Sequence, residues 1–111
     1  MKIEEKSIND IPVLKLYGRF DSLTSEHLEE RLTSVIEAGA SNICLDCQAV
    51  EFISSSALRI LLSGLKKVKR NQGTIVLAAM SDQIKEVFDL AGFLELFAVH
   101  NTCEEALMML Q

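Results

Sequence analysis

The sequence has 111 residues, a formal net charge of −5 at pH 7 and 49% apolar residues. This length and composition are typical of one folded domain, so we expect a single domain over residues 1–111. The acidic balance argues against a nucleic-acid partner, because such a surface requires clustered Lys and Arg. Apolar runs such as "TIVLAAM" are far shorter than the ~20 residues that cross a bilayer, which argues against a membrane span.

The first ten residues, "MKIEEKSIND", carry acidic side chains early. They lack the apolar block of a secretion signal. We therefore expect the protein to act in the cytoplasm.

The first third of the chain predicts a strand pair and a helix. Residues 2–8 and 11–20 are rich in β-favouring side chains and flank the turn-forming pair Asn9-Asp10. In residues 24–39, apolar side chains recur at helical spacing, with Thr24 as a candidate cap and Gly39 as a stop. This pattern predicts an amphipathic helix.

The rest of the chain alternates between short apolar segments and amphipathic ones. The predicted strands cover residues 42–47, 74–79 and 96–100, and the helix after each covers residues 56–70, 82–92 and 103–110. This order requires crossover connections, so part of the sheet is parallel. We predict an α/β fold with a mixed β-sheet and about four helices packed mainly on one face.

Three consecutive serines, Ser54, Ser55 and Ser56, stand between the strand "NICLDC" and the helix that follows. One hydroxyl is enough to cap a helix, because it accepts a hydrogen bond from one of the free amides at the helix start. The other two are either small polar loop residues or residues with a function of their own.

The segment from "ICLDC" through the serines to "VFDLAGFLELF", together with "GRFDSLTSEHL" upstream, resembles the STAS domain of bacterial anti-sigma factor antagonists. The resemblance spans nearly the whole chain. In that family the loop usually reads Asp-Ser-(Ser, Thr or Ala)-Gly-Leu, and its first serine is phosphorylated by a partner kinase that is also an anti-sigma factor.

Carried onto this sequence, the resemblance implies phosphorylation at Ser55, with Ser56 as the second choice. Ser54 stands in place of the aspartate, Ala57 in place of the glycine, and Leu58 matches the core anchor. The implied partner-binding residues are Asp21, Arg59 and the loop residues Ser54, Ser55, Ser56 and Ala57. Local capping or turn formation is the alternative role of Asp21.

The resemblance implies a binding module rather than an enzyme, with no cofactor of its own. The implied partners are an anti-sigma factor/serine kinase of the GHKL type and a PP2C-type phosphatase that removes the phosphate. The alternative is a non-switching accessory subunit that docks on a transporter ATPase or another regulatory complex, which the replaced aspartate favours. The resemblance leaves open whether the protein forms a weak homodimer.

A phosphate on a serine at a helix start is compatible with the fold, because free amides there attract anions. It adds roughly −1.5 to −2 charges at neutral pH. We expect its main effect at an interface. On the same helix, Arg59, Lys66 and Arg70 recur at helical spacing and form either a basic stripe or an ordinary solvated face.

The cysteines Cys44, Cys47 and Cys103 are odd in number, which argues against a disulfide framework. "CLDC" has the spacing of a redox motif, but its first cysteine lies in a predicted strand about ten residues before the helix, whereas redox chemistry favours a helix start. A zinc site would need His27, His100 or Cys103 as well, and these are isolated, without a second paired cluster. We expect core thiols and no metal. Asp46 is expected at a strand end, in a solvated turn.

Overall fold

The pair Asn9-Asp10 forms the turn that the sequence predicts. Both residues have positive φ angles, 52° and 66°, which a tight two-residue hairpin turn requires. The turn joins β1 (Lys2–Ile8) to β2 (Ile11–Phe20) in antiparallel pairing, with Ile8 opposite Ile11. The chain therefore opens with a β-hairpin.

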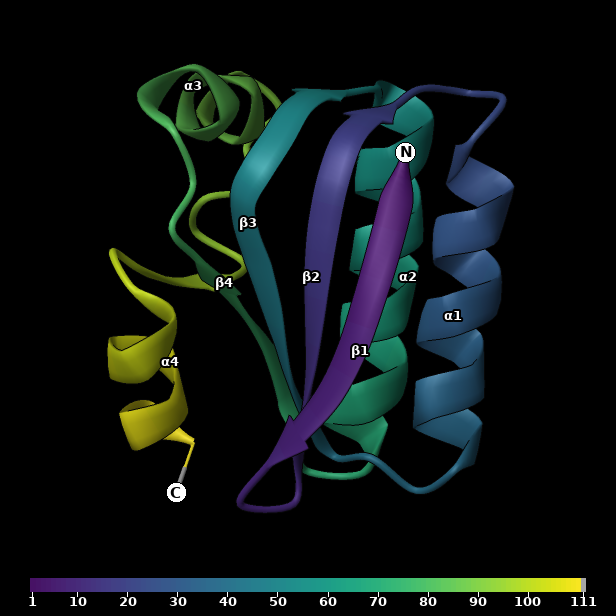
Figure 1. Ribbon diagram of the computed structural model, residues 1–111, viewed down its shortest axis with the longest axis vertical. Helices are drawn as coiled ribbons and strands as arrows, with labels where there is room; N and C mark the ends of the chain where they lie inside the picture. The colour runs from purple at the N-terminus through teal and green to yellow at the C-terminus, as the bar shows by residue number, and fades with distance from the viewer. Residues whose placement is uncertain (111) are drawn as a thin grey trace.

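The computed structural model describes residues 1–110 (Figure 1). After the hairpin come α1 (Ser25–Glu37), β3 (Asn42–Ile53), α2 (Ser55–Arg70), β4 (Thr74–Ala78), α3 (Asp82–Leu90), β5 (Ala98–His100) and α4 (Cys103–Met109). The strands form one sheet in the order β1-β2-β3-β4-β5, in which the pairs from β2 to β5 are parallel. The predicted mixed sheet and α/β class are confirmed.

The main core lies between the sheet and the helices α1, α2 and α3. Alternate strand residues face this layer, where Leu14, Leu45 and Leu77 are fully buried. The helices contribute their apolar stripes: Leu28, Leu32, Leu58, Leu61, Leu65, Val68, Ile84 and Phe88. Three of the four described helices therefore pack into one layer, as predicted.

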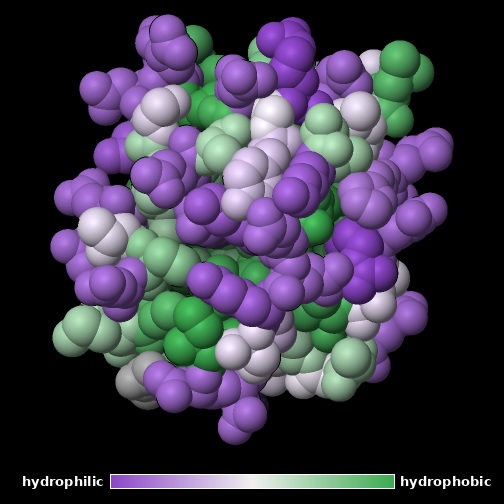
Figure 2. Space-filling view, in the orientation of Figure 1, coloured by the Kyte–Doolittle hydropathy of each residue, from purple (hydrophilic) through white to green (hydrophobic). Residues whose placement is uncertain are grey.

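Helix α4 packs on the opposite face of the sheet. Its buried residues Ala106 and Leu107 join Val13, Cys44 and Val76 in a second, smaller core. In Figure 1 α4 lies to the left of the sheet, and Figure 2 shows an apolar area at the lower left of a largely polar face. Helix α4 covers only part of the opposite face of the sheet, where Lys15 and Tyr17 of β2 stay partly exposed.

Strand β3 is longer than predicted. Its first residues pair with β4 as far as Asp46 opposite Ala78, and the strand then continues beside β2 up to Ile53 opposite Phe20. The placement of Asp46 at a strand end is therefore wrong. It lies within β3, where its carboxylate accepts a hydrogen bond from the Gln48 amide at 3.1 Å.

The turn after α2 passes against the segment that precedes β3. The Thr74 amide donates a 3.0 Å hydrogen bond to the Ser41 carbonyl, and the Gly73 amide bonds to the Val68 carbonyl at 2.8 Å. A Cβ atom on Gly73 would overlap the Ser41 carbonyl group. Only glycine fits here without movement of the backbone.

Candidate functional site

The carboxyl ends of β2 and β3 lie side by side and position the candidate site. Phe20 and Ile53 are opposite each other at these ends, and the Ser54 amide donates a 2.8 Å hydrogen bond to the Phe20 carbonyl. The loop that begins at Asp21 therefore starts next to the serine loop. Asp21 and Ser54 are far apart in sequence, and the parallel register brings their segments together.

Ser54 is the serine that caps α2. Its backbone is extended, with φ −88° and ψ 167°, and its hydroxyl oxygen accepts a hydrogen bond from the Ala57 amide at 3.2 Å. The Ser54 carbonyl accepts a hydrogen bond from the Leu58 amide at 3.0 Å. The helix begins at Ser55, one residue before the predicted start, and its first amides point out of the helix end.

The residues after the cap divide between surface and core. Ser55 is exposed and Ser56 is half-buried, whereas Ala57 and Leu58 are buried. Ala57 is fully buried, so the position carries a methyl group that packs inward. The structure thus places Ser55 outward at the first position of the helix, with a neighbour that is less accessible.

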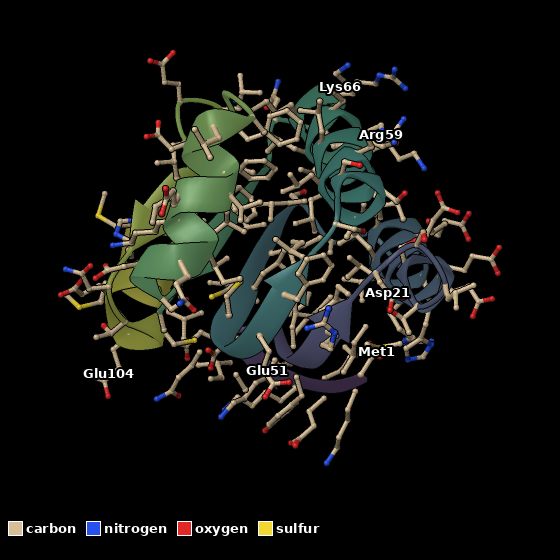
Figure 3. The ribbon with its side chains drawn as sticks, turned by 90° about the horizontal axis from the view of Figure 1, so that it is seen from above. Met1, Asp21, Glu51, Arg59, Lys66 and Glu104 are labelled. Atoms are coloured by element: carbon tan, nitrogen blue, oxygen red, sulfur yellow. The ribbon has the colours of Figure 1, made fainter. Side chains whose placement is uncertain are left out.

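Arg59 lies one helical turn beyond Ser55, on the exposed side of α2. Its Nε donates a 3.4 Å hydrogen bond to the Ser55 carbonyl. Figure 3 looks onto this end of the molecule and shows Arg59 on the same side as Asp21, with Lys66 farther along α2. Lys66 and Arg70 are also exposed, as either reading of the basic stripe requires.

Asp21 organises the loop before α1. Its carboxylate accepts hydrogen bonds from the amides of Leu23 and Thr24, both at 3.0 Å, and from the Thr24 hydroxyl at 3.2 Å. The Thr24 amide is the main cause that lowers the pKa of the Asp21 carboxyl below its ordinary value. Asp21 is therefore a fixed negative charge at neutral pH.

The predicted cap of α1 needs a correction. Thr24 occupies the position before the helix, but its hydroxyl oxygen accepts no hydrogen bond from a helix amide. The single hydroxyl proton is shared between the Arg19 carbonyl at 3.0 Å and the Asp21 carboxylate. The Thr24 hydroxyl oxygen also accepts a hydrogen bond from the Asp21 backbone amide at 3.0 Å. Because these bonds use the hydroxyl within the loop, the Asp21 turn holds the start of α1 in place of a side-chain cap.

Two apolar side chains beside this site were missed by the sequence analysis. Leu23 is 88% exposed in the Asp21 loop, and Phe52 is 38% exposed at the end of β3. The Arg19 guanidinium lies over the Phe52 ring, 4.5 Å from its centre. Leu23 falls outside the apolar stripe of α1, and this was the signal that could have identified it.

The cysteine pair of "CLDC" is split between the two faces of the sheet. Cys44 packs under α4, whereas Cys47 faces the layer of α1 to α3. Burial raises the pKa of both thiols, that of Cys47 to about 12. A strand points residues three apart to opposite faces, so this pair does not form a redox motif. The predicted placement of both thiols in the core is confirmed.

Within residues 1–110, no group of three or more His, Cys, Asp or Glu side chains is arranged to hold a metal ion. None of the helices described there has both the length and the apolar character needed to cross a membrane.

Comparisons with known proteins agree on one family. The model of the STAS domain family matches residues 2–106. The Bordetella bronchiseptica protein named "Putative anti-sigma factor antagonist BtrV" is 33% identical over 106 residues, which cover 96% of this chain and 91% of that protein.

Solved structures share the fold. An anti-sigma factor antagonist from Mycobacterium paratuberculosis superposes with a TM-score of 0.90 at 23% identity, over 98% of this chain and 92% of the other. SpoIIAA of Bacillus superposes with a TM-score of 0.85 in its unphosphorylated form, at 19% identity over 97% of this chain and 95% of the other. At these identities the likeness establishes the fold alone.

The family assignment rests on the match over residues 2–106 and on the relative that is 33% identical. Anti-sigma factor antagonists are regulators without an enzymatic activity, in agreement with the expectation from the sequence. The chain belongs to the STAS domain family, in its group of anti-sigma factor antagonists.

Proposed function

We propose that this protein is a phosphorylation-controlled partner switch. In its unphosphorylated form it binds an anti-sigma factor of the GHKL kinase type in the cytoplasm and thereby releases the sigma factor. The kinase phosphorylates Ser55 with ATP, which ends the binding, and a PP2C-type phosphatase restores the binding form. The observation that carries this proposal is the exposed position of Ser55 at the start of α2, beside a Ser54 hydroxyl already used as the cap.

The surroundings of Ser55 explain how a phosphate would end the binding. Asp21 is a fixed negative charge in the neighbouring loop, so a phosphate adds like charge to the surface that the partner contacts. Arg59 lies four residues after Ser55, within reach of a phosphate there. A phosphate would pair with the Arg59 guanidinium and withdraw it from the partner.

The exposed apolar side chains Leu23 and Phe52 supply the desolvated part of the proposed interface. Leu23 lies in the loop after β2 and Phe52 lies at the end of β3, next to the polar loop residues. We propose a docking surface made of Asp21, Leu23, Phe52, the serine loop and Arg59. Ala57 supports this surface from below, since its side chain is buried.

The replacement of the family's aspartate by Ser54 does not favour the accessory subunit. Asp and Ser are both strong N-cap residues, and the Ser54 hydroxyl already occupies the cap. The loop therefore keeps its helix start without the carboxylate.

The test is to isolate the protein from its native cell in three versions: wild type, Ser55→Ala and Ser56→Ala. Intact-mass measurement and peptide mapping should find a singly phosphorylated fraction in wild type and Ser56→Ala and none in Ser55→Ala. Phosphate on Ser55→Ala but not on Ser56→Ala would move the site by one residue. Wild type without any phosphate would favour the accessory subunit.

Binding completes the test. Ser55→Ala should keep its affinity for the kinase, because the loss of a hydroxyl leaves the neutral surface almost unchanged. Ser55→Asp should weaken binding, and each 1.4 kcal/mol of penalty lowers the affinity about tenfold. Its effect should be smaller than that of phosphate, since it carries less charge.

A further inference from the structure

The sulfur atoms of Cys44 and Cys103 lie 3.6 Å apart, although the two residues are 59 positions apart in the chain. Cys44 is fully buried in β3, on the face that α4 covers. Cys103 is the first residue of α4 and is partly exposed. The packing of Ala106 and Leu107 against the sheet brings the two thiols together.

This separation places the sulfurs in contact but leaves them unbonded. A disulfide bond is about 2.05 Å long, so the sulfurs must approach by roughly 1.5 Å. Cys103 lies at the start of the last helix described, whose main contacts are with β3, β4 and β5. This approach requires a rotation of the Cys103 side chain together with a shift of α4.

We propose that Cys44 and Cys103 are an oxidant-responsive thiol pair that closes to an intramolecular disulfide when the protein meets a peroxide. This inference stands independently of the proposed partner switch. Disulfides in reducing compartments are mostly transient and redox-sensing, and the two sulfurs here lie in contact without a bond between them.

The order of the two steps follows from exposure. The accessible Cys103 thiol attacks hydrogen peroxide, the O–O bond breaks, and Cys103 becomes a sulfenic acid with release of one water. The Cys44 thiol then attacks the Cys103 sulfur, the S–O bond breaks, and the displaced hydroxide takes the Cys44 proton as a second water. The two thiols together lose two electrons and two protons, and the peroxide is reduced to water.

Cys47 is the matched control for this chemistry. It lies three residues after Cys44 in the same strand but faces the other core, with its sulfur 3.6 Å from the Leu45 carbonyl oxygen. No described thiol faces it on that side. In an unfolded chain the short loop would favour a Cys44–Cys47 bond, so only the fold selects Cys103.

The experiment treats the folded, reduced protein with hydrogen peroxide, blocks the remaining thiols and maps the disulfides by mass spectrometry. Wild type and Cys47→Ala should lose the mass of two hydrogens and give a peptide pair linked through Cys44 and Cys103. Cys44→Ala and Cys103→Ser should give no intramolecular link. Ser55→Ala should behave as wild type, which separates this result from the proposed switch.

Several outcomes would overturn the proposal. They are a Cys44–Cys47 bond, a bond between two molecules through Cys103, over-oxidation of Cys103 while Cys44 stays a thiol, and no reaction at all. The mapping on wild type decides between them even if Cys44→Ala folds poorly. A repeat in denaturant should shift the link toward Cys44–Cys47, which confirms that the native pairing depends on the fold.

Discussion

The Ser54 amide donates a 2.8 Å hydrogen bond to the Phe20 carbonyl, and this bond joins the ends of two parallel strands at the candidate site. On one side it fixes the residue that caps α2, and on the other it fixes the residue before Asp21. Both donor and acceptor belong to the backbone, so substitutions of nearby side chains leave the bond in place. The relative position of the two loops is therefore set by the sheet.

The cap role of Ser54 predicts a loss of stability in Ser54→Ala. The lost hydrogen bond to the Ala57 amide should lower the free energy of unfolding by about 1 kcal/mol. Ser54→Asp should restore the stability, because a carboxylate caps equally well and favours the helix dipole. Urea unfolding measures both, with Ser55→Ala as the control. Equal losses in Ser54→Ala and Ser55→Ala would contradict the assignment of the cap.

The proposed docking surface predicts that Arg59→Glu weakens kinase binding without unfolding the protein. Arg59 is exposed next to the serine loop, so the reversal places an acid where the partner approaches. A loss of about 1.4 kcal/mol would lower the affinity about tenfold. The control is Arg70→Glu at the far end of α2, since exposed charges are screened over about 8–10 Å. Calorimetric titration should find a larger loss of affinity in Arg59→Glu than in Arg70→Glu. Equal losses of affinity would show that the interface is not centred on the serine loop.

The hydrogen bonds of Asp21 predict a dependence of stability on pH. The pKa of its carboxyl is lowered in the folded state from the ordinary value of 3.8, so the folded state favours the ionised form. The resulting stabilisation is complete above this ordinary value and is lost as pH falls through the lower native pKa. Asp21→Asn keeps an oxygen acceptor but has no charge to lose. The difference in Tm between wild type and Asp21→Asn should therefore shrink in acid, and a constant difference would refute this reading.

The close approach at Gly73 predicts a large cost for Gly73→Ala. The new methyl group would overlap the Ser41 carbonyl, which belongs to the backbone of the segment before β3 and moves only with it. We expect a loss of about 3 kcal/mol in the free energy of unfolding. Gly92→Ala is the matched control, because it adds a methyl group in open space and costs only the strain of a φ of +77°, about 1 kcal/mol. A smaller loss at Gly73 than at Gly92 in thermal unfolding would count against the described turn.

The local patterns in the sequence predicted the order and type of the elements, because each helix has an apolar stripe and each buried strand an apolar run. The second half of β3 was not predicted because its strand pairing is irregular. Its pairing with β2 shifts register, so polar Gln48 and Glu51 interrupt the apolar run. The position of α4 on the opposite face was not predictable either, since the apolar stripe of a helix does not indicate which face of a sheet it covers.

The sequence predicted which residues form the site, but not that their two segments lie side by side. The resemblance of the serine loop to its family pointed to Ser55, and Asp21 came from the same resemblance. The contact of their two segments follows from strand register, which local patterns do not encode. The pairing of Cys44 with Cys103 shows the same limit: the spacing of "CLDC" pointed to the wrong neighbour, and the tertiary fold supplied the right one.

The ladder between β3 and β4 ends at Asp46, so residues 47–53 are joined to the sheet through β2 alone. The serine loop is thus carried at the tip of a two-stranded ribbon, whose outer edge lacks the strand that braces its base. The ribbon is held in place by its side chains, because Phe20, Val50 and Ile53 are buried in the main core with the helices α1, α2 and α3. The position of the serine loop therefore depends on core packing beneath it, whereas the base of the sheet is held by β4 as well.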